Sequence, residues 1–177
     1  IWHNQLVVQN DAHRFFIFSG DAFHPLAHPE SFDGGTISGL FPLGKDTMLI
    51  TTIKNGIFYF SDGRFRPWVT KHDAFLKENR IYCAVMLPDQ VLALGTSLNG
   101  LVTLDTRRRI IQHLNKKSGL QNNTILSLCA LPNGSLWMGL DNGLDFVRLK
   151  SAFSTFYPDG DLQGTGYTAE VYQDKIY

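Results

Sequence analysis

The chain has 177 residues, the size of one ordinary domain, so it is long enough to bury a sizeable core. Its 16 Lys and Arg balance its 16 Asp and Glu, and this net charge of zero argues against nucleic acid as a partner. The 13 Phe, 6 Tyr, 3 Trp and 16 Gly indicate a β-rich protein with many turns, and the apolar runs are too short to cross a membrane.

Residues 1–34 read as an incomplete unit of short strands. The chain begins at Ile1 without a start Met or a signal sequence, so we expect it to be a piece of a longer protein. Apolar runs at Leu6–Val8, Phe15–Ser19 and Phe23–Leu26 predict three strands. These runs match the second, third and fourth strands of the unit that follows.

Residues 35–79 are the first complete unit, with four predicted strands separated by turns. The turn between its second and third strands carries Asn55-Gly56. Asn-Gly tolerates the positive φ angles of a type I′ turn and is a strong hairpin signal between apolar runs. The predicted strands are Ile37–Leu43, Thr47–Thr52, Ile57–Phe60 and Arg64–Trp68.

The same pattern returns in residues 80–123 and 124–166, the second and third units. Asn99-Gly100 follows the first Asn-Gly pair by 44 residues (99 − 55). Asn142-Gly143 follows after 43 more (142 − 99), because the third unit lacks one residue before its turn. The predicted strands of these units are Ile81–Leu87, Val91–Thr96, Leu101–Leu104, Ile110–Leu114, Ile125–Leu131, Ser135–Leu140, Leu144–Val147 and Ser154–Tyr157.

Residues 167–177 read as the first strand (Tyr167–Tyr172) and the start of the second strand (Lys175–Tyr177) of a further unit. Four antiparallel strands in roughly 40–45 residues are the size of one β-propeller blade, and such a unit must stack on neighbours to bury both its faces. We therefore predict an all-β fold without helical segments. It is a β-propeller segment of about four four-stranded antiparallel blades, all in one domain fragment that belongs to a larger propeller.

The third unit carries a resemblance to a known family. Its lead-in, Leu120 to Ile125, and its second hairpin, Pro132 to Leu144, are similar to the two-component regulator propeller repeat. That repeat reads approximately GL-x-x-N-x-V and then D-x-x-G-x-LW-[IV]-GT-x-x-GL. The resemblance extends more loosely over residues 35–166, and Leu140 departs from it by standing where the family has Thr.

That resemblance implies the periplasmic or extracellular sensor region of a bacterial two-component signalling receptor, typically a hybrid histidine kinase. The implied partners are a small ligand, in many members a carbohydrate fragment, and neighbouring blades, a second propeller or a dimerising parent receptor. The kinase would lie outside these residues, so we expect this segment itself to be no enzyme. Contact with nucleic acid or with a membrane is not expected.

No combination of residues predicts catalysis, a cofactor or a metal site. Gly95-Thr96-Ser97-Leu98-Asn99 lacks the last Gly of a nucleophile elbow and falls in a repeat hairpin. His24 and His28 lack the Glu of a zinc motif. Asp159-Gly160-Asp161 lacks the remaining ligands of a calcium loop and reads as a turn.

Three further features each have two interpretations. Arg107-Arg108-Arg109 is either a solvated hairpin tip or a docking patch for an acidic partner. Trp68 and Trp137 lie at strand positions, which favours burial between blades over a role as sugar-binding platforms. Cys83 and Cys129 fall in apolar strands and are either two free core thiols or a disulfide.

Topology, rather than a motif, indicates where a ligand would bind. The Asn-Gly turns and the links at Leu76–Arg80 and Leu120–Thr124 should share one rim, and propeller ligands often bind near the axis on that side. Nothing distinguishes the polar residues of these links as ligand contacts from ordinary turn formers, so the ligand-binding residues are left unassigned. These polar residues are Asn79, Arg80, Asn122 and Asn123.

Three functions therefore compete. The first is a ligand-sensing propeller, and the second is a protein-interaction propeller without a small ligand. The third is a fragment of a propeller polysaccharide lyase or glycosidase, for which these residues offer no acid pair. The two ends of the chain either join to close a small ring or belong to a larger one, and an open arc would expose strand edges.

Overall fold

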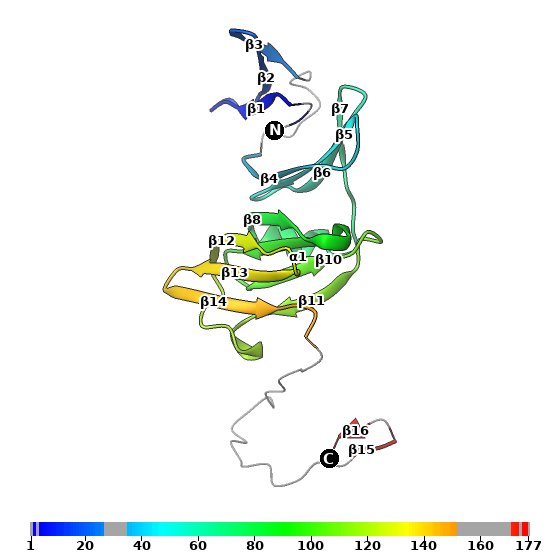
Figure 1. The fold of residues 1–177 in the computed structure, drawn as a ribbon, viewed down its shortest axis with the longest axis vertical. Coiled ribbons are helices and arrows are strands. Elements are labelled where there is room, and N and C mark those ends of the chain that lie inside the picture. The colour runs from blue at the N-terminus through cyan, green and yellow to red at the C-terminus, as the bar shows by residue number, and fades with distance from the viewer. Residues whose placement is uncertain (1, 3, 27–34, 152–170, 174, 177) are drawn as a thin grey trace.

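The fold is a row of antiparallel β-sheets stacked on one another in chain order (Figure 1). The computed structural model describes residue 2 and residues 4–26, 35–151, 171–173 and 175–176 of the chain. Within these residues the sheets have three or four strands each, followed by one two-stranded hairpin. This arrangement is a partial β-propeller, which confirms the predicted fold class.

Each whole unit supplies one sheet, in which every strand pairs with its neighbour in sequence. The predicted strands of these units are present to within one residue at either end, except Ser154–Tyr157, which lies outside the described residues. The strands are β4 (Ile37–Pro42), β5 (Thr47–Thr52), β6 (Gly56–Ser61), β7 (Arg64–Pro67), β8 (Ile81–Met86), β9 (Leu92–Thr96), β10 (Leu101–Leu104), β11 (Ile110–Leu114), β12 (Ile125–Ala130), β13 (Ser135–Leu140) and β14 (Gly143–Arg148).

The two ends of the chain hold smaller sheets. The N-terminal sheet has the three predicted strands, and β1 lies at its edge, where the first strand of a complete unit would pair. Near the C-terminus a short hairpin falls within the predicted partial unit. The strands are β1 (Leu6–Gln9), β2 (Phe15–Ser19), β3 (Ala22–Pro25), β15 (Val171–Tyr172) and β16 (Lys175–Ile176).

The first strand of every whole unit carries an irregularity at the same place. Its pairing with the second strand shifts by one residue, as expected for a β-bulge. The shifts fall at Ile37/Gly39, Ile81/Cys83 and Ile125/Ser127. Their spacing of 44 residues (81 − 37 and 125 − 81) shows that the repeat extends to the defects of the sheet as well as to its strands.

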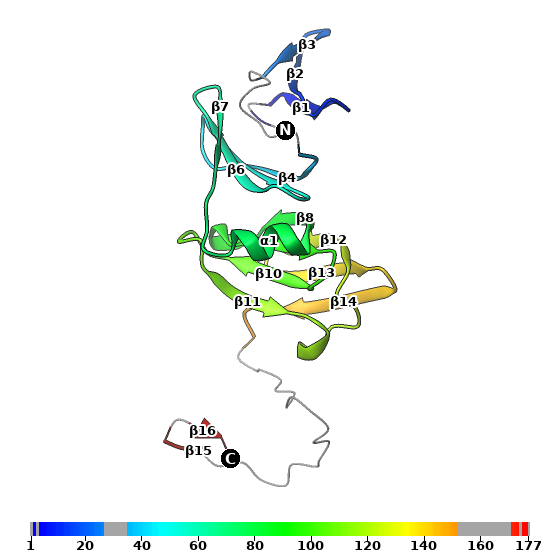
Figure 2. The same ribbon diagram turned by 180° about the vertical axis from the view of Figure 1, so that it is seen from behind.

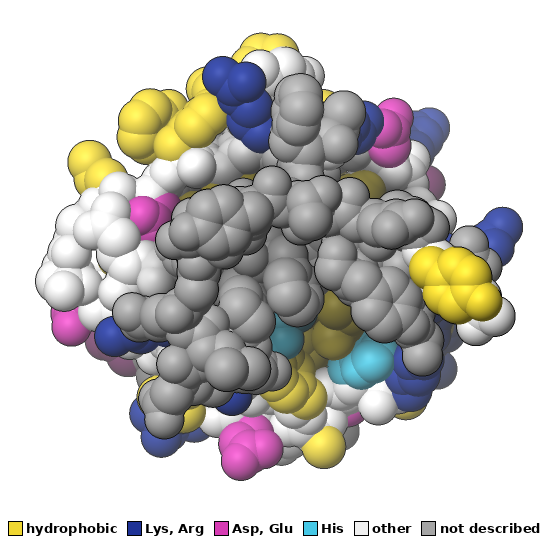
Figure 3. Space-filling view, turned by 90° about the horizontal axis from the view of Figure 1, so that it is seen from below, with side chains coloured by type: hydrophobic (Ala, Val, Ile, Leu, Met, Phe, Trp, Pro, Cys, Tyr) yellow, Lys and Arg dark blue, Asp and Glu magenta, His cyan; other side chains and the backbone are white. Residues whose placement is uncertain are grey.

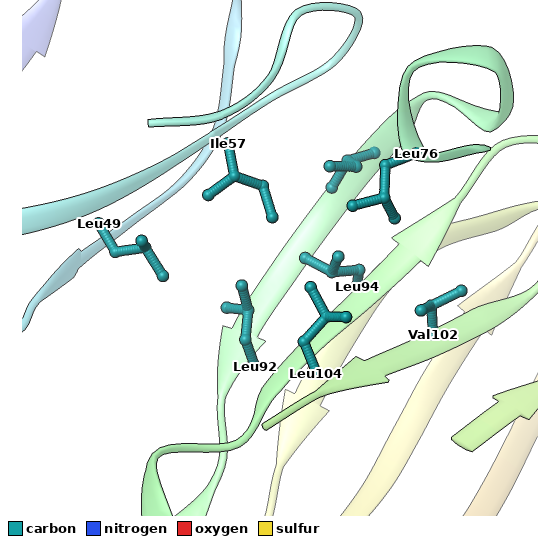
Figure 4. Close-up of a cluster of buried hydrophobic side chains, with 8 residues drawn as sticks. Leu49, Ile57, Leu76, Leu92, Leu94, Val102 and Leu104 are labelled. Atoms are coloured by element: carbon teal, nitrogen blue, oxygen red, sulfur yellow. The ribbon is translucent and has the colours of Figure 1, made fainter. Parts of the chain in front are cut away.

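Charged side chains of both signs lie around the periphery of the end of the molecule seen in Figure 3, and apolar side chains fill the spaces between sheets. Successive side chains of a strand point to opposite faces of its sheet. Ile50 belongs to a cluster with Phe15 of the N-terminal sheet, whereas its neighbour Leu49 belongs to a cluster with Leu92 and Leu94 of the second unit (Figure 4). Full burial of such a side chain contributes about 1.5–3 kcal/mol.

A helix precedes the second unit, although the sequence analysis predicts none. α1 (Asp73–Asn79) lies beside the sheet β8–β11 (Figure 2). Thr70 N donates to Asp73 Oδ1 at 2.8 Å, and Leu76 is buried in the cluster shared by the first two units. The helix has only seven residues, too few for a helical period to be visible, and its N-cap residue, His72, makes no side-chain cap hydrogen bond.

The Asn-Gly pairs form hairpins, as predicted, but not type I′ turns. Positive φ is confined to the glycines, at 87° for Gly56, 75° for Gly100 and 134° for Gly143, and the preceding asparagines have negative φ. A type I′ turn requires positive φ at both central residues. The predicted turn type is therefore wrong.

A buried threonine explains the actual turn in the first two units. Thr52 pairs with Gly56 across a three-residue loop, and its Oγ1 accepts a hydrogen bond from Asn55 N at 3.0 Å and donates to Gly56 O at 2.8 Å. Thr96 makes the same two bonds in the second unit, at 2.9 and 2.8 Å. The hydroxyl thereby satisfies backbone groups inside a hairpin that ends in a left-handed glycine.

In the third unit Leu140 occupies the position of these threonines, and the loop is one residue shorter. Leu140 pairs directly with Gly143, and Gly139 pairs with Leu144. The deletion is confined to the loop, so the strands on either side keep the same faces as in the other units.

We expect Thr96→Val to lower the free energy of unfolding by about 1–2 kcal/mol, because it leaves Asn99 N without the acceptor that it has in the folded chain. Urea unfolding measures the change. Thr106→Val, at an exposed turn position, is the matched control and should have little effect. Equal destabilisation by the two variants would contradict the role of the hydroxyl.

Candidate functional site

The Asn-Gly turns and the links between sheets meet at one rim, as the topology predicts. Gly100 N donates to Asn123 O at 2.8 Å, and Asp141 N donates to Thr124 O at 3.2 Å. The second hairpin is thus tied to the link that enters the third unit, and the third hairpin is tied to the link that enters its own unit. We call this surface the Asn-Gly rim, and it comprises the turns 53–56, 97–100 and 141–143 and the links 76–80 and 120–124.

The asparagines of the rim are engaged in holding it together. Asn122 accepts from Thr124 N at 3.0 Å through Oδ1 and donates through Nδ2 to Asn142 Oδ1 at 2.7 Å. Asn123 Oδ1 accepts from Lys116 N at 2.8 Å. In the helix, Asn79 Nδ2 donates to a backbone oxygen at 2.8 Å, and the exposed Arg80 follows with a positive φ of 56°. In the described structure these asparagine side chains therefore make hydrogen bonds that hold the turns, the links and the end of the helix in place.

A cavity lies on the opposite rim, between the second and third units. Its volume is about 160 Å³, close to that of a cavity that accepts benzene. The ion pair of Lys150 Nζ with Asp89 Oδ2, at 2.5 Å, stands at its edge and is exposed. The lining residues are Leu87, Pro88, Val91, Thr103, Ile111, Gln112, Gly134, Leu149 and Lys150.

A smaller cavity, of about 100 Å³, occupies the equivalent place between the first and second units. Three of its lining residues have counterparts 44 positions later in the larger cavity: Leu43 corresponds to Leu87, Trp68 to Gln112 and Gln90 to Gly134. The exchange of Trp for Gln and of Gln for Gly removes side-chain volume, which explains why the later cavity is larger. The exchanges of Trp68 for Gln112 and of Gln90 for Gly134 can be read from the sequence by aligning the repeats, but they were not part of the prediction.

In the run Arg107 to Arg109, the side chains of Arg108 and Arg109 contact neighbouring residues. Arg108 Nη1 donates to Val69 O at 3.0 Å, and its guanidinium carbon lies 5.2 Å from the centroid of the Trp68 ring. Arg109 pairs with Asp105 at 2.7 Å, and hydrogen bonds from the Arg109 backbone and side chain lower the pKa of that carboxyl. The run is therefore a hairpin tip that also fastens the link after the first unit, with Arg107 exposed.

The two tryptophans differ in burial. Trp68 packs against the cluster shared by the first and second units, in agreement with the prediction. Trp137 is 47% exposed and stacks on Phe146 with ring centroids 4.9 Å apart, so the predicted burial between blades is wrong for the described structure. The reason is that no described sheet covers the outer face of β12–β14.

Both cysteines are free thiols, and their environments differ. Cys83 points toward Gly95, where an added Cβ would lie 2.5 Å from its sulfur, and burial raises the pKa of the Cys83 thiol to about 12. Cys129 is exposed. The pair is therefore not a disulfide, and only Cys129 is open to reagents.

The remaining sequence candidates provide no reactive cluster. Ser97, the serine of the incomplete nucleophile-elbow pattern, lies half-buried in the turn after β9, where its backbone N–H donates to Asn79 O at 3.1 Å and its carbonyl accepts from Thr124 Oγ1 at 2.8 Å. His24 lies on the exposed strand β3, while His28 and Asp159 to Asp161 fall outside the described residues. In the described ranges no three His, Cys, Asp or Glu side chains gather as metal ligands would. The helices described there are also too short or too polar to span a membrane.

Solved structures share this fold. The extracellular domain assigned to the hybrid two component system BT4673 of B. thetaiotaomicron matches with a TM-score of 0.60 and 18% identity over 80% of this chain. The corresponding domain of BT3049 from the same organism matches with a TM-score of 0.54 and 19% identity over 87%. PorZ, a surface component of the type-IX secretion system of Porphyromonas gingivalis, matches with a TM-score of 0.59 and 19% identity over 76%.

The chain spans only about a fifth of the length of these structures, 19% of the first, 22% of the second and 22% of the third. At these identities the likeness establishes the fold, and the matched proteins extend well beyond the part that this chain covers. No family model matches the chain, and no curated protein does either.

We expect iodoacetamide at pH 8 to modify Cys129 and to leave Cys83 unmodified in the folded chain, because the reactive form of a thiol is the thiolate. Mass spectrometry of tryptic peptides measures the two rates. In urea both thiols should react alike. Equal rates without urea would contradict the buried position of Cys83.

The same thiol makes stability depend on pH. Burial raises the pKa of the Cys83 thiol in the folded state to about 12, whereas the ordinary pKa of a thiol is 9.0, so stability is intact below pH 9 and declines above it. The slope approaches about 1.4 kcal/mol per pH unit from this group. Cys83→Ala should show a shallower decline than the unaltered chain when both are unfolded with urea at pH 8 and pH 10.5. Parallel declines would contradict the linkage.

Proposed function

We propose that this chain is a blade segment of an extracellular or periplasmic sensor in a bacterial two-component signalling receptor. It binds a small ligand and passes the binding on as a change in blade packing. The observation that carries the proposal is the shared fold with the extracellular domains of BT4673 and BT3049, over 80% and 87% of this chain. The resemblance of Pro132 to Leu144 to the sensor-propeller repeat supports it.

The ligand class is a neutral oligosaccharide, and its site is the Asn-Gly rim. The rim presents neutral amide groups from Asn99, Asn122 and Asn142 on its turns and links, and Asn122 Nδ2 lies 2.7 Å from Asn142 Oδ1. Amides both donate and accept hydrogen bonds, which suits the hydroxyls of a sugar. The chain has no net charge to attract an ionic ligand instead.

The segment itself works by binding rather than by catalysis. The nucleophile-elbow pattern at Gly95 to Asn99 is incomplete and falls in a repeat hairpin, which favours this interpretation. A histidine kinase elsewhere in the parent receptor would supply the enzymatic step. Blade stacking carries the signal in this proposal, because the hairpin of the second unit is hydrogen-bonded to the link of the third unit, Gly100 N to Asn123 O.

We expect the melting temperature of the chain to rise by about 5 °C when a recognised neutral oligosaccharide is present at about a hundred times its Kd. A thermal-shift screen against neutral and acidic oligosaccharides, followed by calorimetric titration, measures the effect. Asn142→Ala on the rim should weaken binding, whereas Asn133→Ala, at a turn outside the rim, should leave it unchanged. Silence across the whole panel would overturn the ligand class.

A further inference from the structure

The cavity between the second and third units has a buried hydroxyl without a partner in its wall. Thr103 lines this cavity of about 160 Å³ from the strand β10, and its side chain is only 1% exposed. Among the described residues its Oγ1 finds no hydrogen-bond partner. A buried polar atom left in this way costs free energy, and a ligand that forms a hydrogen bond with it recovers that cost.

The alternation of β10 places Thr103 on the face toward the third unit. Thr103 shares that face with Leu101, which is buried in the cluster between the second and third units. Threonine carries its hydroxyl and its methyl group on the same carbon. Rotation about χ1 exchanges the two groups, so the hydroxyl can meet a molecule that rests against this wall of the cavity.

The second unit has small side chains at this place in the repeat. Thr103 pairs across the strands with Ala93, and equivalent pairs occur 44 residues earlier (103 − 59) and 43 residues later (146 − 103). The three pairs are Leu49 with Tyr59, Ala93 with Thr103 and Trp137 with Phe146. The pair of the second unit is the smallest, so the second unit leaves room where the other two units have larger side chains.

Two interactions between the units hold the walls of the cavity in place. Gln112 Nε2 donates to Leu149 O at 3.0 Å, and Lys150 forms an ion pair with Asp89. In each interaction one partner belongs to the second unit and the other to the end of β14 in the third unit. The cavity is therefore formed before a ligand arrives, so binding needs little rearrangement.

We propose that this cavity binds a small neutral molecule that has an apolar ring and one hydroxyl group, as a phenol does. Leu87, Val91 and Ile111 provide apolar walls, and the volume is close to that of a cavity that accepts benzene. Thr103 Oγ1 is the partner of the ligand hydroxyl, because a threonine hydroxyl both donates and accepts hydrogen bonds.

The charges at the edge of the cavity favour a neutral ligand. Lys150 is paired with Asp89, so its positive charge is already balanced. A carboxylate ligand would lose its hydration among apolar walls without gaining an unpaired cation. The cavity lies on the rim opposite the Asn-Gly rim, and the inference does not depend on a sugar ligand.

Phenol and toluene test the site in the 177-residue chain, because they share a ring and differ in the hydroxyl group. We expect both probes to shift the methyl NMR signals of Val91 and Ile111. Thr103→Val keeps the shape of the side chain and removes its hydroxyl. It should weaken the binding of phenol about tenfold and leave that of toluene unchanged, whereas Thr106→Val, at an exposed turn, should affect neither probe.

A second variant tests the location. Gln112→Trp introduces the side chain that the first unit has at Trp68, and it should abolish the binding of both probes by filling the cavity. Asn142→Ala, on the Asn-Gly rim, should leave phenol binding unchanged, so a failure of the sugar proposal would not affect this one. If Gln112→Trp does not fold, Thr103→Val still decides the outcome.

Four results would overturn the proposal. Unchanged signals of Val91 and Ile111 with both probes at millimolar concentration would exclude the cavity as a binding site. Equal weakening of phenol and toluene by Thr103→Val would exclude the hydroxyl as the partner. Tighter binding of benzoate than of phenol would exclude a neutral ligand. Without a ligand, Thr103→Val should melt no lower than the unaltered chain, and a large loss would mean that the hydroxyl already has a partner.

Discussion

The sheets β4–β7 and β8–β11 each have two apolar faces, and the neighbouring sheets cover them. In β5 the alternation of Leu49 and Ile50 assigns one residue to the following sheet and the other to the preceding one. Burial is therefore shared between units, and no unit has a core of its own. The order of the sheets, the position of the links and the exposure of the last sheet all follow from this single requirement.

Because the strands are occupied with stacking, polar chemistry is left to the two rims. On the Asn-Gly rim the threonine hydroxyls and asparagine amides satisfy backbone groups of turns and links, as Thr96 and Asn123 illustrate. The opposite rim holds the two cavities between neighbouring units, and the size of the lining side chains determines how large each cavity is. Two substitutions relative to the previous unit, at Gln112 and Gly134, are enough to enlarge it.

The strands could be predicted from the sequence because each was present in several copies, so that a weak run such as Ile110–Leu114 was supported by its register. Features that occur once were missed. The helix α1 is too short to show a period, and its N-cap residue, His72, makes no side-chain capping hydrogen bond that the sequence could signal. The turn type was wrong because the Asn-Gly signal ignores the threonine hydroxyl three residues earlier. The exposure of Trp137 depends on what lies beyond the sheet, and no local pattern contains that.

The shortened hairpin of the third unit bears on how such a repeat diverges. One residue is absent between Leu140 and Gly143, yet the inward and outward side chains of β13 and β14 keep their places. The same deletion within a strand would exchange its two faces and place polar residues in both neighbouring interfaces. Duplicated units can therefore gain or lose residues in their loops, where the change in structure stays local. Within the strands they must remain in phase with the units on both sides.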